Sequence, residues 1–83
     1  MAKPFRRVRE PDAKAVTLCL AKRDGATMGE VKLPDGRLFS TTGVLPIAEA
    51  FGIAVHVANE SDREIVVVDP QNLWQASWGE LTA

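Results

Sequence analysis

The chain has 83 residues, a length typical of one small domain with a modest hydrophobic core. Hydrophobic residues make up 46% and charged residues 25%, which is ordinary for a globular protein, and the single cysteine excludes an internal disulfide bond. The net charge is −1, the first ten residues contain no apolar signal-peptide core, and the most apolar early run, "AVTLCLA", is too short for a membrane span. These features predict a cytoplasmic protein with no membrane partner.

Residues 1–10 form a short basic segment ahead of a mildly acidic remainder. Four basic side chains fall within residues 1–9, and Arg6, Arg7 and Arg9 are three of them. We expect a flexible arm over residues 1–10 and a single small domain over residues 11–83. Such an arm can contact nucleic acid or another anionic surface, and the alternative is a solvated tail without a role.

A first helix is predicted over residues 12–23. Asp12 can accept hydrogen bonds from the free amides of a first helical turn. Lys22 and Arg23 suit the negative end of a helix dipole, and Gly25 suits a left-handed cap. Thr27 and Glu30 then have the spacing of a capping box, which predicts a short second helix over residues 28–32.

The same region also fits strands. Val16, Leu18 and Leu20 alternate with smaller or polar residues, as in a half-buried strand. Asp24-Gly25 would then be a hairpin tip, and Pro34-Asp35-Gly36 would be the turn of a second hairpin. This alternative gives a β-meander over residues 15–41.

The second half of the chain predicts a third helix, a hairpin and a terminal helix. The third helix covers residues 43–51, with Pro46 tolerated near its start and Gly52 ending it. Alternating apolar residues predict a strand over 53–58, and "EIVVVD" predicts another over 64–69. The polar loop "NESDR" joins the two strands. A short terminal helix would place Trp74, Trp78 and Leu81 on one stripe.

Two motifs, "GATMGEV" and "FGIAVHVANESDREIVVVD", carry a family resemblance. The chain resembles small uncharacterised bacterial winged helix-turn-helix-like domains over residues 13–69. The resemblance implies a small α+β, winged-helix-like domain with three short helices, a C-terminal β-hairpin and a short terminal helix. It also implies DNA binding through the third helix and the wing. The alternative fold is a β-meander plus a helix.

Signatures of catalysis are absent from the sequence. There is no glycine-rich phosphate loop, no nucleophile motif and no cluster of metal-ligand residues. His56 is the only histidine, and Cys19 lies in an apolar run, which favours packing over reactivity. We therefore expect a protein that is not an enzyme and uses no metal or cofactor, with no small-molecule substrate evident.

Two binding hypotheses remain. A DNA-binding transcriptional regulator would contact phosphates through the arginines of the arm, the loops and the wing, although the predicted third helix has no basic residue. The leading hypothesis is a non-catalytic binding module that acts through protein–protein contacts with another protein or a second copy. Trp74 and Trp78 are its candidate contact residues, because aromatic side chains anchor interfaces. The nucleic-acid candidates are Arg6, Arg7, Arg9, Arg37 and Arg63.

Overall fold

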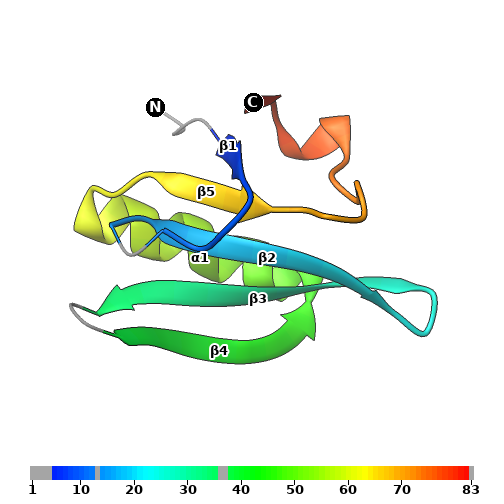
Figure 1. Cartoon of the computed structure of the whole chain (residues 1–83), viewed down its shortest axis with the longest axis horizontal. Coiled ribbons are helices and arrows are strands. Elements are labelled where there is room, and N and C mark those ends of the chain that lie inside the picture. Colours follow the sequence, from blue (N-terminus) through cyan, green and yellow to red (C-terminus); the bar gives the residue numbers. More distant parts are fainter. Residues whose placement is uncertain (1–4, 13, 36–37, 83) are drawn as a thin grey trace.

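The computed structural model describes residues 5–12, 14–35 and 38–82, and these form a six-stranded sheet with one long helix against one face (Figure 1). The strand order across the sheet is β4-β3-β2-β5-β1-β6. Strands β2, β3 and β4 pair antiparallel, whereas β5 pairs parallel with β2 and β1, and β6 pairs parallel with β1. The strands are β1 (Phe5–Val8), β2 (Val16–Arg23), β3 (Ala26–Asp35), β4 (Leu38–Pro46), β5 (Ile65–Val68) and β6 (Leu81–Thr82), and the helix is α1 (Ile47–Ser61).

The winged-helix prediction is wrong. The segment predicted as the first helix holds β2, and residues 28–32 lie within β3. These two strands and β4 form an antiparallel meander, so this region follows the alternative interpretation of the sequence. Asp24 and Gly25 have φ values of 51° and 80°, the left-handed conformation that both central residues of a tight type I′ hairpin turn require.

The helix-start signal at Asp12 serves a loop instead. Its carboxylate accepts a hydrogen bond from the Lys14 amide at 2.9 Å, and its own amide donates to Thr17 Oγ1 at 3.1 Å. A short polar side chain can satisfy nearby amides in a turn as well as at a helix end. Asp12 is therefore an amide acceptor, as the sequence predicts, but it belongs to a loop rather than to a helix.

The helix predicted over 43–51 has the wrong bounds and the strand predicted over 53–58 is wrong in type, because one helix covers Ile47–Ser61. Pro46 directly precedes it, where its missing amide costs nothing, and Gly52 lies inside it. Ala50, Ala54 and Ala58 recur every four residues and are buried against the sheet. The four-residue spacing of these alanines is therefore the pattern that matches the observed helix. Ile53, Val55 and Val57, whose alternation predicts a strand, are only half-buried.

The strand predicted at "EIVVVD" exists as β5, but it has no hairpin partner in residues 53–58. It lies between β1 and β2, with Ile65 opposite both Phe5 and Val16. Ile65, Val66 and Val67 are all buried, because side chains on both faces of this central strand are covered. A continuous run of β-branched residues is typical of such a parallel strand.

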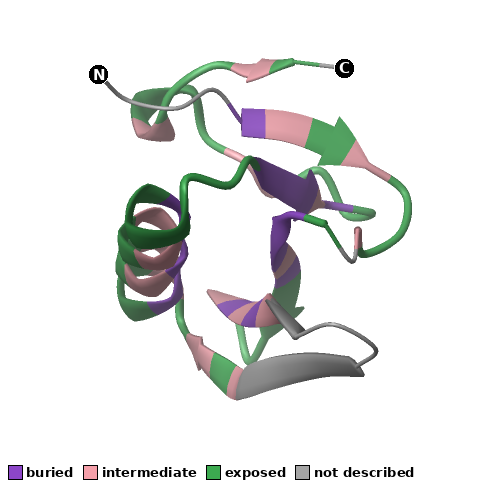
Figure 2. Ribbon diagram, turned by 90° about the vertical axis from the view of Figure 1, so that its left-hand side faces the viewer, coloured by how far each residue is buried: buried purple, intermediate pink, exposed green. Residues whose placement is uncertain are grey.

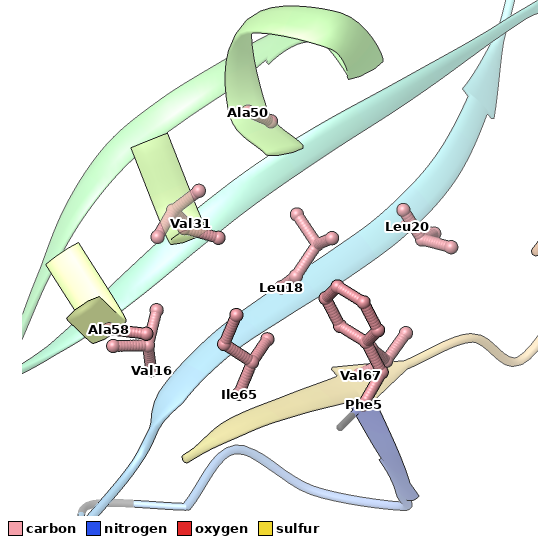
Figure 3. Close-up of a cluster of buried hydrophobic side chains, with 10 residues drawn as sticks. Phe5, Val16, Leu18, Leu20, Val31, Ala50, Ala58, Ile65 and Val67 are labelled. Atoms are coloured by element: carbon pink, nitrogen blue, oxygen red, sulfur yellow. The ribbon is translucent and has the colours of Figure 1, made fainter. Parts of the chain in front are cut away.

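The core lies between the sheet and α1 (Figures 2 and 3). Leu18 and Val31 face each other from β2 and β3, and Ala50 approaches the same layer from the helix. Gly29 allows this approach, since a Cβ atom there would lie 2.8 Å from the Cβ of Ala50. Small residues on both sides thus let the helix pack closely on the sheet.

The two ends of the described chain meet at one edge of the sheet. Residues 5–8, part of the segment expected to be a flexible arm, form β1 within the sheet. The predicted terminal helix is wrong: Ala76–Trp78 form one 3₁₀ turn, and Leu81 begins β6. Thr82 Oγ1 donates a hydrogen bond to the carbonyl oxygen of Phe5 at 3.1 Å, which ties β6 to β1.

Candidate functional site

Asp69 organises the chain just after β5. Its side chain is fully buried, and its carboxylate accepts hydrogen bonds from the amides of Leu73 at 2.7 Å and Trp74 at 2.8 Å. Asn72 within this turn has a φ of 57°, and its amide donates to the Asp69 carbonyl oxygen at 3.3 Å. The carboxylate therefore fixes the turn that brings Trp74 back over the edge of the sheet.

Arg7 of β1 is held beside this turn. Its guanidinium Nη2 lies 3.6 Å from Asp69 Oδ2 and donates to Asn72 Oδ1 at 3.2 Å. The Arg7 side chain is 43% exposed, so the contact orients the guanidinium while leaving part of it open to solvent. Arg7, which the sequence suggests as a phosphate contact, therefore already has the buried carboxylate of Asp69 beside it.

Four aromatic rings, those of Phe5, Phe51, Trp74 and Trp78, form one cluster. Phe5 stands 5.0 Å from Trp74 and 5.3 Å from Phe51 between ring centroids. Trp74 and Trp78 meet edge to face at 5.3 Å and 90°, a geometry that aromatic quadrupoles favour. The Trp74 indole N–H donates to the Gly79 carbonyl oxygen at 3.0 Å, so the ring is fixed by a hydrogen bond as well as by packing.

A groove of about 440 Å³, here called the aromatic groove, opens beside this cluster. Its walls are Arg7, Trp74, Ala76 and residues 79–82. Trp78 lines a second hollow of about 300 Å³ together with Ile47, Ala48 and Phe51 of α1. Because Trp74 lines one hollow and Trp78 the other, the tryptophan pair lies between them.

The structure brings both candidate contact tryptophans together, but among the described arginines it gathers only Arg7 and Arg9, which line one groove. Arg6 donates to both carboxylate oxygens of Glu64, at 2.7 Å and 3.2 Å, and this hydrogen bonding raises the pKa of Arg6. Arg6 and Arg7 are consecutive in β1 and point to opposite faces of the sheet. Arg63 donates to the Lys14 carbonyl oxygen at 3.0 Å.

Arg9 and Arg37 are the two remaining arginines of the prediction. Arg9 lines a separate groove of about 290 Å³ with Arg7, Val8 and residues 68–70. Arg37 lies outside the described residues. Of the arginines that the structure describes, Arg7 and Arg9 share a groove, while Arg6 and Arg63 are hydrogen-bonded to Glu64 and Lys14.

Cys19 and His56 stay apart from the aromatic groove. Cys19 is half-buried on β2, and burial raises the pKa of its thiol. His56 is exposed on α1. Within residues 5–12, 14–35 and 38–82, no three His, Cys, Asp or Glu side chains are grouped so that they could hold a metal ion. Among these same residues, no helix has both the length and the apolar character needed to cross a membrane.

Sequence reasoning missed Asp69, Arg7 and Leu81 as parts of one site. The pattern at Asp69-Pro70 predicts the end of a strand, although an aspartate followed by proline also favours a turn with side-chain bonds to later amides. The pairing of β1 with β5 and β6 joins residues far apart in the chain, and no local sequence pattern predicts this pairing. No family model, curated protein or solved structure matches the chain in comparisons with known proteins.

Proposed function

We propose that the protein is a small, non-catalytic binding module that acts through protein–protein contacts, with the aromatic groove as its contact surface. The observation that carries this proposal is the partial burial of Trp74 and Trp78. Both rings pack against the hydrophobic core, yet both remain partly exposed and line hollows. Rigid aromatic side chains of this kind contribute much of the binding energy at protein interfaces.

The chemistry of the groove suits a polypeptide. Trp74, Ala76 and Leu81 offer apolar surface, while Arg7 and Glu80 place opposite charges on the same walls. A partner segment with an apolar side chain and both hydrogen-bond donors and acceptors matches this combination. A polyanion matches it less well, because Glu80 repels phosphate and Arg7 already faces Asp69.

Site-specific photo-crosslinking tests the proposal. A benzoylphenylalanine replaces Ala76, an exposed residue of the groove, and a control chain carries it at Glu60, an exposed residue near the end of α1. We expect a discrete adduct with one polypeptide from position 76 only, in cells that express the protein. The charge reversal Glu80→Lys, made in the chain that carries the crosslinker at position 76, should reduce that adduct. Glu60→Lys, an exposed charge reversal made in the same chain, should leave the adduct unchanged.

Two outcomes contradict the proposal. One is an identical adduct pattern from positions 76 and 60, which means that the groove has no selective contact. The other is tight binding of duplex DNA that weakens steeply between two salt concentrations and depends on Arg6 and Arg9. That result assigns the protein to nucleic-acid binding instead.

A further inference from the structure

The outer face of α1 carries another groove, which shares no lining residue with the aromatic groove. Ala50, Ala54 and Ala58 face the sheet, so the opposite side of the helix is directed to solvent. An open groove of about 420 Å³, here called the outer groove, lies on this side. Its lining residues are Ala48, Glu49, Gly52, Ile53 and His56.

Packing within the single chain does not explain why residue 52 is a glycine. It lies in the interior of a 15-residue helix, where glycine is less favourable than alanine. A Cβ atom at Gly52 would meet no atom within 4 Å, and its φ is not in the left-handed region. By contrast, a Cβ at Gly29 would collide with Ala50. Contacts within the chain therefore require a glycine at position 29 but not at position 52.

We propose that the outer groove binds a second copy of this chain, with the two α1 helices packed antiparallel and crossing at Gly52. A glycine at a helix crossing lets the two backbones approach closely. The contact is isologous, so a two-fold axis near Gly52 relates the same surface on both copies. This inference rests on α1 alone and does not depend on the role of the aromatic groove.

The polar residues of the outer groove select the antiparallel arrangement. Glu49 lies three residues before Gly52 and His56 lies four residues after it. An antiparallel pair therefore places the Glu49 carboxylate of each copy beside His56 of the partner copy, and an imidazole N–H can donate to a carboxylate. The two contacts flank the crossing about 10 Å apart, from the helical rise of 1.5 Å per residue. A parallel pair would instead place Glu49 against Glu49, and like charges repel.

Substitution at Gly52 separates the proposed contact from folding. We expect sedimentation equilibrium of the full chain, between about 10 μM and about 1 mM, to show a monomer–dimer equilibrium. Gly52→Ala should raise the Tm of the monomer by about 4–8 °C, measured in dilute solution, because alanine is the better helix former. The same change should weaken the dimer about tenfold, since its methyl group occupies the crossing.

Charge reversal then identifies the partner surface. Glu49→Lys and His56→Glu should each weaken association, because each opposes like-charged or unmatched groups. The two changes together should restore association, because the introduced lysine of one copy then lies beside the introduced glutamate of the other. If the single changes acted only by damaging the fold, combining them would not restore association. Glu60→Lys, an exposed change on the same helix, is the matched control and should leave association unchanged.

Three results overturn the proposal. The first is a wild-type chain that stays monomeric up to about 1 mM. The second is a dimer that Gly52→Ala and the single charge reversals leave unchanged, which places the interface elsewhere. The third is a double reversal that fails to restore association after both single changes have weakened it.

Discussion

Gly29 lies where α1 packs directly on the sheet, and the missing side chain is what allows the contact. A Cβ there would lie 2.8 Å from Ala50 Cβ and 3.2 Å from Leu18 Cδ1, and both residues are buried. We expect Gly29→Ala to lower the free energy of unfolding by about 1–3 kcal/mol through overpacking. Urea denaturation measures this. Gly52→Ala is the matched control, and a loss of stability that is equal at both glycines would contradict the packing account.

A second single residue, Cys19, should make the free energy of unfolding depend on pH. Burial raises the pKa of its thiol; Glu30 adds to this, and Lys32 opposes it. The folded chain therefore holds the thiol proton more tightly than the unfolded chain does. The resulting stability is fully present below the unfolded pKa of about 8.5 and is lost as the pH rises through the higher folded value.

We expect the free energy of unfolding of the wild type to fall more steeply above about pH 8.5 than that of Cys19→Ala. Urea denaturation at a series of pH values gives both curves. The folded thiol should also react more slowly with an alkylating reagent than the thiol of the urea-unfolded chain. Parallel pH curves for the two proteins would show that Cys19 does not titrate differently in the folded state.

At the scale of the element, local sequence signals identify turns and caps more reliably than they identify the element to which each belongs. Gly25 has the positive φ that both interpretations of the sequence require, but with Asp24 it forms the turn of the alternative hairpin rather than the cap of the predicted helix. The choice between helix and strand fails because capping residues serve turns as well as helix ends. Gly52 misleads in the opposite direction, because a glycine that would suit a helix end lies inside α1.

The turn after β5 is the element on which the aromatic groove depends. Asp69→Ala removes the acceptor of the Leu73 and Trp74 amides. We expect a loss of about 1–3 kcal/mol for each amide left without a partner, measured by urea denaturation. Asp69→Asn keeps one acceptor oxygen and should recover part of that loss. If Asp69→Ala left both stability and tryptophan fluorescence unchanged, the carboxylate would not be what positions Trp74.

At the scale of the whole molecule, the sequence does not reveal which segments meet. Strand β5 is predictable from its β-branched run, but its parallel neighbours are 60 and 49 residues away, counted from Ile65 to Phe5 and to Val16. Such pairing depends on the burial of the completed sheet rather than on a local pattern. For the same reason the sequence points to the two tryptophans as contact candidates but cannot join their neighbours Arg7 and Asp69 to them.

Phe5 connects these distant segments. It is buried, it contacts the rings of Phe51 and Trp74, and its backbone pairs with both β5 and β6. We expect Phe5→Ala to cost about 3–5 kcal/mol, a large share of the total stability of so small a domain. Phe51→Ala should cost less, because Phe51 is only half-buried.

Urea denaturation, monitored by tryptophan fluorescence, tests whether Phe5→Ala costs more stability than Phe51→Ala. Trp74 and Trp78 report on both changes because they lie in the same cluster. Phe5→Leu keeps most of the apolar volume and should retain most of the stability. The folded Phe5→Ala chain should also show red-shifted emission, since loss of the Phe5 ring opens the cluster to water. An equal or smaller cost at Phe5 than at Phe51 would mean that the C-terminal segment is anchored by α1 rather than by β1. The aromatic groove would then be a feature of the helix and the terminal turn alone, and Arg7 would no longer be fixed as one of its walls.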